Sequence, residues 1–244
     1  MTDILYKHVP ATYHHIPRTA GTSLKIWTRE NIKDFEEAPL PEFTPANIDL
    51  VPNYDYMKTI WPDMGTRFTF VRNPFSRLVS LYHFVGQIAS NRLIEYRQYM
   101  REKQLPDNWK RYPYQSDNVV SCIIDDTRLL EMYRKGFDYY LYCLSNPNEW
   151  YDNIRPNSYH LVKSFWHTDT QLSLFCGQLP DIIIKMENLD TEFVKVQDLL
   201  QCNAPLPHIN TTEHNNYQSY YTAQDRQLVA KMFAKDLATF KYEF

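Results

Sequence analysis

The pattern of apolar and polar positions predicts a chain in which strands alternate with helices. Residues 11–17 (ATYHHIP) and 66–72 (TRFTFVR) are short and rich in aromatic and β-branched side chains, which is typical of strands. Residues 181–186 (DIIIKM) contain a continuous apolar run, which indicates a strand covered on both faces. These three segments are the predicted sheet.

Helical spacing of apolar residues follows the first two strands. One helix is predicted over residues 22–31. A longer one is predicted from Pro74, which suits a first helical turn, through Tyr99 or Met100. One or two helical turns are expected over residues 54–60, within a proline-rich connection.

Two further helical regions are predicted nearer the C-terminus. One covers roughly residues 117–144 with a break near Gly136, and the other opens with a capping pair, Thr222 and Asp225. Strands separated by helices predict an α/β fold with a central parallel sheet flanked by helices. The length favours a single domain over residues 1–244.

Composition and charge limit the classes of partner that the chain is expected to bind. The formal net charge of −3 gives no global basic field for nucleic acid or a membrane surface, so any anion needs a local site. No early stretch resembles a signal peptide and no run of ~18 apolar residues exists, so no membrane anchor is expected. The cysteines are widely spaced, which favours buried thiols and a reducing, cytoplasmic location; they are Cys122, Cys143, Cys176 and Cys202.

The turn after the first predicted strand carries residue types that suit a bound phosphate. A helix that starts here presents unpaired N–H groups, glycine permits close approach, and arginine can grip a phosphate in two places. The stretch lacks the two glycines of the usual nucleotide loop. A simpler interpretation, in which a hydroxyl caps the helix and the arginine is solvated, stays open. The residues are Arg18, Thr19, Ala20, Gly21, Thr22 and Ser23.

A second candidate anion site follows the next strand. Arg72 closes that strand, and Ser80 lies two helical turns further on. Ligands of α/β sheets lie beyond the carboxyl ends of the strands, where both turns are expected. A capping arginine and a surface serine are the structural alternative. Two anion sites on adjacent strand ends would suit a ligand with two separated phosphates.

The two turns together resemble a known family. "HIPRTAGTSL" (15–24) followed by "FTFVRNPFSRLVSLYHF" (68–84) is similar to the sulfotransferases that use 3′-phosphoadenosine 5′-phosphosulfate (PAPS), in particular their carbohydrate-type branch. The stretches "TQLSLF" (170–175) and "IIIKMENLDTEF" (182–193) also resemble this family. The resemblance implies a single P-loop-like sulfotransferase domain over residues 1–244.

The resemblance also implies a role for each site residue. Residues 18–23 would wrap the 5′-phosphate and the sulfuryl group, while Arg72 and Ser80 would bind the 3′-phosphate. The product would be adenosine 3′,5′-bisphosphate, and the acceptor a hydroxyl of a carbohydrate or small metabolite. No metal is implied. Arg18 stands where the family usually has lysine, so it is the expected stabiliser of the leaving group.

The general base is the one role for which the resemblance supplies no matching residue. Many carbohydrate-type members place a histidine shortly before the second strand, but residues 44–66 contain none. Asp49 and Asp55 are the nearest titratable candidates, although surface or capping roles are the simpler interpretation for both. His15 falls where the family also tends to have histidine, which suits packing better than catalysis.

Two other functions remain open from the sequence. Arg18 and the missing histidine are compatible with a module that binds a nucleotide without turnover. A small-molecule kinase that uses ATP shares the strand–loop–helix site, although the missing second glycine argues against it. A preference for a 3′-phosphate would separate the kinase from the other two.

Overall fold

The computed structural model describes residues 3–38, 54–102, 129–146, 170–209 and 215–244. The chain divides into two compact units. The first comprises residues 1–77, 169–213 and 226–244, and the second comprises residues 78–168 and 214–225.

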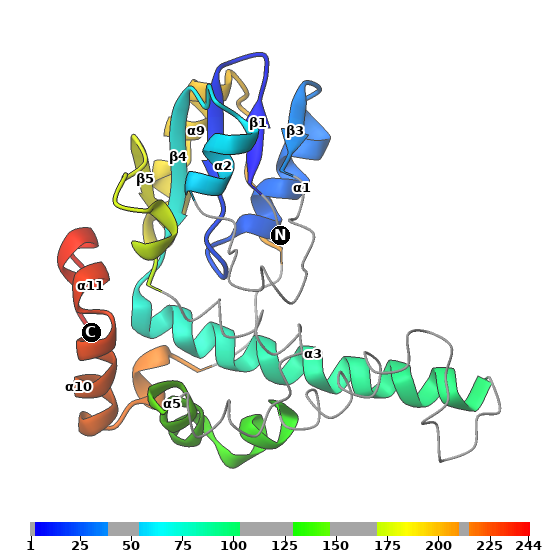
Figure 1. Ribbon diagram of the computed structural model, residues 1–244, viewed down its shortest axis with the longest axis vertical. Helices are drawn as coiled ribbons and strands as arrows, with labels where there is room; N and C mark the ends of the chain where they lie inside the picture. Colours follow the sequence, from blue (N-terminus) through cyan, green and yellow to red (C-terminus); the bar gives the residue numbers. More distant parts are fainter. Residues whose placement is uncertain (1–2, 39–53, 103–128, 147–169, 210–214) are drawn as a thin grey trace. The chain divides into compact units, whose positions relative to one another are not determined.

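The first unit is a five-stranded sheet with helices on both faces (Figure 1). Its strand order is β3-β1-β2-β4-β5. The strands are β1 (Ile4–Tyr6), β2 (Ala11–His14), β3 (Phe35–Glu37), β4 (Thr66–Val71) and β5 (Ile182–Lys185). The helices are α1 (Gly21–Asn31), α2 (Tyr54–Ile60), α8 (Leu189–Glu192), α9 (Val194–Leu200), α10 (Ala223–Met232) and α11 (Ala234–Phe240), with 3₁₀ turns η1 (Ser173–Phe175) and η2 (Met186–Asn188). The long helix α3 (Pro74–Glu102) begins in this unit, and α10 begins in the second.

The sheet is mixed, which corrects the expectation of a parallel sheet. β2 pairs with β4 and β4 with β5 in parallel, as predicted for these three strands. β1 is antiparallel to both β2 and β3. Both unpredicted strands are three residues long, too short to show a period-two pattern. The carboxyl ends of β2 and β4 meet at one edge because the two strands are parallel neighbours.

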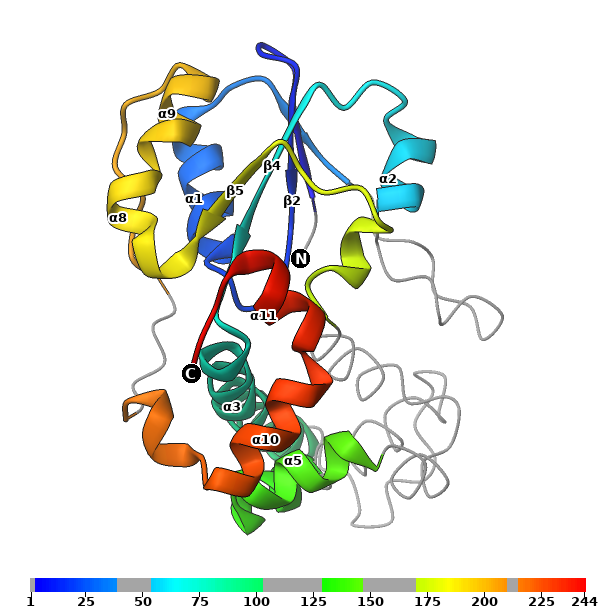
Figure 2. The same ribbon diagram turned by 90° about the vertical axis from the view of Figure 1, so that its left-hand side faces the viewer.

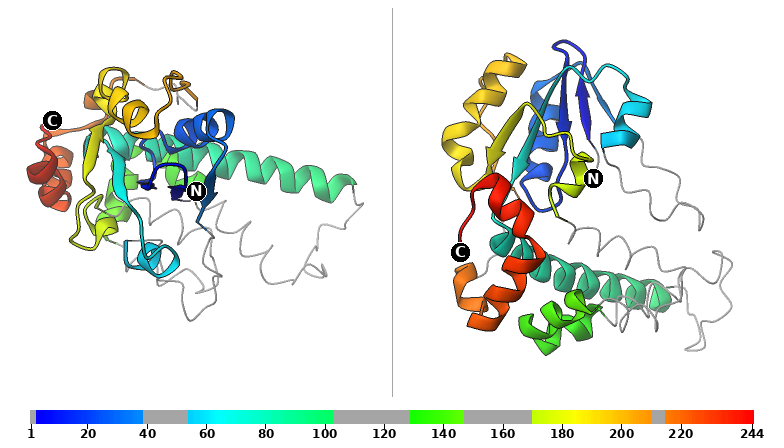
Figure 3. Two further views of the ribbon diagram at one scale, coloured as in Figure 1. Left: turned by 90° about the horizontal axis from the view of Figure 1, so that it is seen from above. Right: turned by 60° about the vertical axis from the view of Figure 1, so that its left-hand side comes forward.

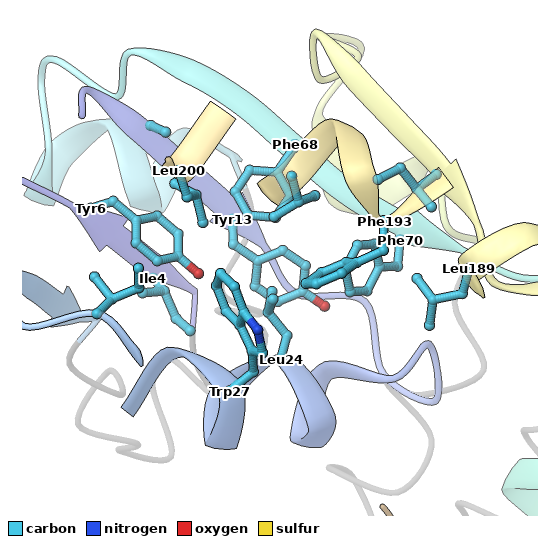
Figure 4. Packing of buried hydrophobic residues seen from close by; sticks show 14 residues of the cluster. Ile4, Tyr6, Tyr13, Leu24, Trp27, Phe68, Phe70, Leu189, Phe193 and Leu200 are labelled. Atoms are coloured by element: carbon cyan, nitrogen blue, oxygen red, sulfur yellow. The ribbon is translucent and has the colours of Figure 1, made fainter. Parts of the chain in front are cut away.

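Aromatic side chains fill the face of the sheet that α1, α8 and α9 cover (Figure 4). Tyr13 of β2 packs against Phe68 and Phe70 of β4, with ring centroids 5.3 and 5.4 Å away. Trp27 of α1 meets the edge of Phe193, between α8 and α9, at 5.3 Å. Burial of these rings fixes α1 on the sheet and so holds the turn that precedes it.

Two smaller clusters cover the opposite face. Figures 2 and 3 show α2 across the sheet from α1, α8 and α9. Met57 and Trp61 pack there with Ala38 and Met64. Nearer the carboxyl ends of the strands, η1 and α11 contribute a cluster made of Ile16, Val71, Leu174, Phe175 and Phe240.

The second unit packs aromatic side chains around α3. Tyr82 of α3 lies 5.4 Å from Phe137 and 4.6 Å from Tyr133, measured between ring centroids. Its hydroxyl donates to the carbonyl oxygen of Tyr133 at 2.6 Å. The 3₁₀ turn η3 (Tyr217–Tyr220) joins this cluster through Tyr220, whose ring lies 5.6 Å from Phe137.

Most predicted helices are present, with local differences. Residues 129–135 are helical, and Gly136 (φ 108°) separates them from α5 (Phe137–Ser145), which confirms the expected break; residues 117–128 of that prediction lie outside the described residues. Thr222 and Asp225 do form reciprocal capping hydrogen bonds. The last helix is interrupted at Phe233, between α10 and α11. Among the described residues, no helix is long and apolar enough to cross a membrane.

Candidate functional site

The turn between β2 and α1 has a left-handed backbone at two non-glycine residues. Arg18 has φ 70° and Ala20 has φ 60°. Such conformations cost free energy and gather at ligand-binding turns. Ala20 precedes α1 and offers no side-chain hydrogen bond to the helix start. The first N–H groups of α1 therefore face the turn with the positive end of the helix dipole, which suits an anion.

Gly21 is required here by a close approach of the His15 ring. A Cβ atom on Gly21 would lie 2.0 Å from both Cε1 and Nδ1 of that imidazole. Burial, assisted by nearby cations that include Arg77 and Arg18, lowers the pKa of His15 to about 3. His15 is therefore a neutral wall of the turn and adds no positive charge to it.

The hydroxyls of Thr19 and Ser23 bind protein backbone. Thr19 is fully buried, and its Oγ1 donates to the carbonyl oxygen of Ile16 at 2.7 Å. The Oγ of Ser23 lies 3.4 Å from the carbonyl oxygen of Ile209 and accepts from the N–H of the same residue at 3.3 Å. These hydroxyls hold the turn in shape, and Thr22 at the helix start is the half-buried one.

The second turn, after β4, is locked by Asn73 and Glu187. The Oδ1 of Asn73 accepts the N–H of Phe75 at 3.0 Å and so caps α3. A carboxylate oxygen of Glu187 accepts the N–H of Asn73 at 2.8 Å, and its other oxygen accepts the hydroxyl of Tyr242 at 2.7 Å. The Nδ2 of Asn73 donates to the carbonyl oxygen of Glu243 at 2.7 Å. The turn is thus tied to the segment after α11.

Arg72 links the two turns directly. Its Nη1 donates to the carbonyl oxygen of Arg18 at 3.4 Å, and its Nε donates to the Oγ of Ser76 at 3.0 Å. Burial and then the neighbouring charge of Arg72 lower the pKa of Arg18 to about 10. Burial lowers the pKa of Arg72 too, more than the carboxylate of Glu187 raises it. Both guanidiniums stay protonated at neutral pH, so this edge of the sheet concentrates positive charge that an anion would stabilise.

The other predicted site residues lie outside these two turns along the chain. Asp49 lies outside the described residues, and Asp55 is the second residue of α2. Ser80 is buried on α3, one helical turn beyond Ser76, and belongs to the second unit. Its role beside Arg72 stays a prediction. Within the described ranges, no cluster of three or more His, Cys, Asp or Glu side chains could hold a metal ion.

Ser76 and Gln171, which the sequence analysis did not single out, contact Arg72 in the second turn, and Asp236 acts through Gln171. Ser76 supports the guanidinium of Arg72, and Gln171 binds the backbone of Arg72. Asp236 of α11 in turn binds Gln171. Ser76 sits one turn after Arg72 in the motif "VRNPFS", so its spacing was visible in the sequence. Gln171 and Asp236 gave no such signal because they are far from Arg72 along the chain.

One comparison with known proteins identifies the family of the chain. A model described as the Sulfotransferase family matches residues 10–243, which is nearly the whole chain. The protein therefore belongs to the sulfotransferase family, and a hydroxyl-bearing acceptor is the partner that this membership implies. Searches of curated proteins and of solved structures found no match.

Proposed function

We propose that the protein transfers a sulfuryl group from PAPS to a hydroxyl of a carbohydrate or small metabolite. The observation that carries this proposal is the pair of half-buried arginines at adjacent strand ends, with Nη1 of Arg72 3.4 Å from the carbonyl oxygen of Arg18. Two cationic turns side by side suit a donor with a phosphosulfate on its 5′-oxygen and a phosphate on its 3′-oxygen. Membership of the sulfotransferase family supports the same reaction.

Each turn then takes one end of the donor. The guanidinium of Arg18 and the N–H groups of Gly21 and Thr22 bind the 5′-phosphosulfate, while Thr19, Ala20 and Ser23 shape the turn. Arg72, supported by Ser76, binds the 3′-phosphate together with Ser80. A P-loop-like donor site in a single domain over residues 1–244 is part of the proposal, and the family match across both compact units supports it.

The reaction is an in-line displacement at sulfur. The acceptor oxygen forms a bond to sulfur while the bond between sulfur and the 5′-phosphate oxygen breaks, and the electron pair of that bond stays on the phosphate. The acceptor proton passes to a base. Adenosine 3′,5′-bisphosphate leaves with an extra negative charge, which Arg18 and the N–H groups of α1 stabilise. This chemistry requires no metal ion.

Asp49 and Asp55 remain the candidates for the base. Replacement of each by asparagine keeps its size and removes its basicity. Loss of kcat by about a hundredfold with unchanged bisphosphate affinity would identify the base, because general bases contribute roughly 10²–10⁴-fold. Unchanged turnover in both variants would exclude both aspartates. We also propose a cytoplasmic location, on the basis of the few, widely spaced cysteines.

Calorimetric titration with adenosine 3′,5′-bisphosphate, AMP, ADP and ATP tests the donor. Micromolar binding of the bisphosphate, at least tenfold tighter than that of AMP or ATP, is the expected result. Tighter binding of ATP would favour a kinase and overturn the proposal. Bisphosphate binding without transfer from labelled PAPS to any hydroxyl in an acceptor screen would favour a non-catalytic nucleotide-binding module.

A further inference from the structure

The side-chain amide of Gln171 pairs with the backbone of Arg72 as a neighbouring strand would. Its Oε1 accepts the N–H of Arg72 at 2.9 Å, and its Nε2 donates to the carbonyl oxygen of Arg72 at 2.8 Å. The β4–β5 ladder ends one residue earlier, where Val71 pairs with Lys185. Gln171 therefore satisfies both backbone groups of Arg72, the first residue after β4. Its side chain is fully buried.

Asp236 of α11 fixes the amide of Gln171 in this orientation. One carboxylate oxygen accepts the N–H of Gln171 at 2.7 Å and lies 3.5 Å from its Nε2, and the other accepts the N–H of Leu172 at 3.0 Å. A flipped amide would turn its oxygen toward this carboxylate and its donor toward the N–H of Arg72, which loses both bonds. Asp236 is fully buried, so water cannot replace either partner.

We propose that Gln171 is a positioning residue that sets the preference of the protein for nucleotides with a 3′-phosphate. The inference rests on the proposed function, since it assumes that Arg72 meets the 3′-phosphate. The backbone of the first turn has its own supports, in Thr19 and in the contact between Gly21 and His15. Loss of the Gln171 amide therefore frees Arg72, whose 3.4 Å hydrogen bond to the first turn can then be lost, while the first turn keeps these other supports.

The test compares Gln171→Met with Gln178→Met. Methionine keeps the length of the side chain and removes both polar partners of Arg72, whereas Gln178 lies exposed in the same segment and is the matched control. In Gln171→Met, we expect the affinity for adenosine 3′,5′-bisphosphate to fall by about tenfold, a typical effect of unpairing buried polar groups. The affinity for AMP should change less than twofold. Equal losses for both nucleotides, or no loss for either, overturn the proposal.

A second variant covers the case in which Gln171→Met does not fold. Gln171→Glu retains the acceptor for the N–H of Arg72, but it can donate to the carbonyl oxygen only when protonated. Beside the carboxylate of Asp236 its pKa is raised. In this variant, the affinity for adenosine 3′,5′-bisphosphate divided by the affinity for AMP should therefore fall as the pH rises from 6 to 9. The comparison at each pH is with the same ratio in the wild type. A ratio that follows the wild type throughout overturns the proposal.

A nucleotide-free measurement separates this inference from the proposed function. The Nε–H of Arg72 is bonded to Ser76 and gives its own ¹H–¹⁵N resonance when exchange is slow. We expect this resonance in the wild type and in Gln178→Met, and its broadening in Gln171→Met. A wild type that does not prefer the bisphosphate refutes the proposed function, whereas an unchanged Arg72 resonance in Gln171→Met refutes the positioning role.

Discussion

The guanidinium of Arg77 donates a hydrogen bond from Nε to the carbonyl oxygen of Pro17 at 3.1 Å. Arg77 lies in the first turn of α3 and is 1% exposed, so the helix that follows the second turn holds the backbone of the first turn. Burial raises the pKa of Asp236, and the positive charge of Arg77 is one of the effects that oppose this rise. One buried cation thus supports Pro17 directly and stabilises the carboxylate that anchors Gln171.

Replacement of Arg77 by methionine should weaken the fold and the first turn together. The change leaves the carbonyl of Pro17 without this donor and Asp236 without a buried counter-charge, so we expect the free energy of unfolding to fall by about 2–4 kcal/mol. Binding of AMP and of the bisphosphate should fall by similar factors. Urea unfolding and calorimetry measure the two effects. Arg29→Met is the control, because Arg29 is exposed and its ion pair with Glu37 is worth at most about 1 kcal/mol. Wild-type stability in Arg77→Met would contradict the bracing role.

Removal of Arg72 should act on one phosphate only. In Arg72→Ala we expect bisphosphate affinity to fall by about a hundredfold, because a charge-assisted contact with the 3′-phosphate is worth roughly 1.5–3 kcal/mol. AMP affinity should change by less than threefold. Equal losses of AMP and bisphosphate affinity in Arg72→Ala would remove Arg72 from the 3′-phosphate site.

Arg18→Lys keeps a cation in the first turn and should retain or raise turnover.

The elements that frame the site were predictable because their signals are local. The strands β2, β4 and β5 and the helices α1 and α3 each show their pattern within their own residues, and so does the cap formed by Thr222 and Asp225. The strands β1 and β3 depend on pairing with distant segments and have three residues each. Local pattern cannot reveal them.

The supports of the site were not predictable for a related reason. Gln171 reaches Arg72 across 99 residues of chain, and Asp236 reaches Gln171 across 65. A polar residue at either position reads as solvent-exposed until the tertiary structure buries it. The cationic turns, by contrast, combine residue types whose chemistry indicates an anion before any contact is known.

The half-buried, neutral His15 should make the protein sensitive to acid. The pKa of His15 is lowered to about 3 in the fold, whereas an unfolded histidine titrates near 6.5. The unfolded state therefore binds the additional proton between these values, and stability falls as the pH drops from about 6.5 toward 3. Urea unfolding measures the free energy of unfolding at pH 7 and at pH 4.5. The decrease in this free energy between the two pH values should be smaller by about 2 kcal/mol in His15→Gln than in the wild type. Equal losses in the two proteins would mean that His15 accepts a proton freely in the fold.

The contact between Gly21 and His15 can be tested by rescue. Gly21 is not among the described residues with positive φ, and the nearest atoms that an alanine Cβ would meet at this position belong to the imidazole, at 2.0 Å. Gly21→Ala should displace the turn, lower the free energy of unfolding by about 1–3 kcal/mol and weaken AMP binding at least tenfold. The double variant Gly21→Ala/His15→Ala removes the ring and should bind AMP as tightly as His15→Ala alone. A double-mutant cycle on unfolding and binding gives the coupling, and simple additivity of the two substitutions would show that His15 does not set the requirement for glycine.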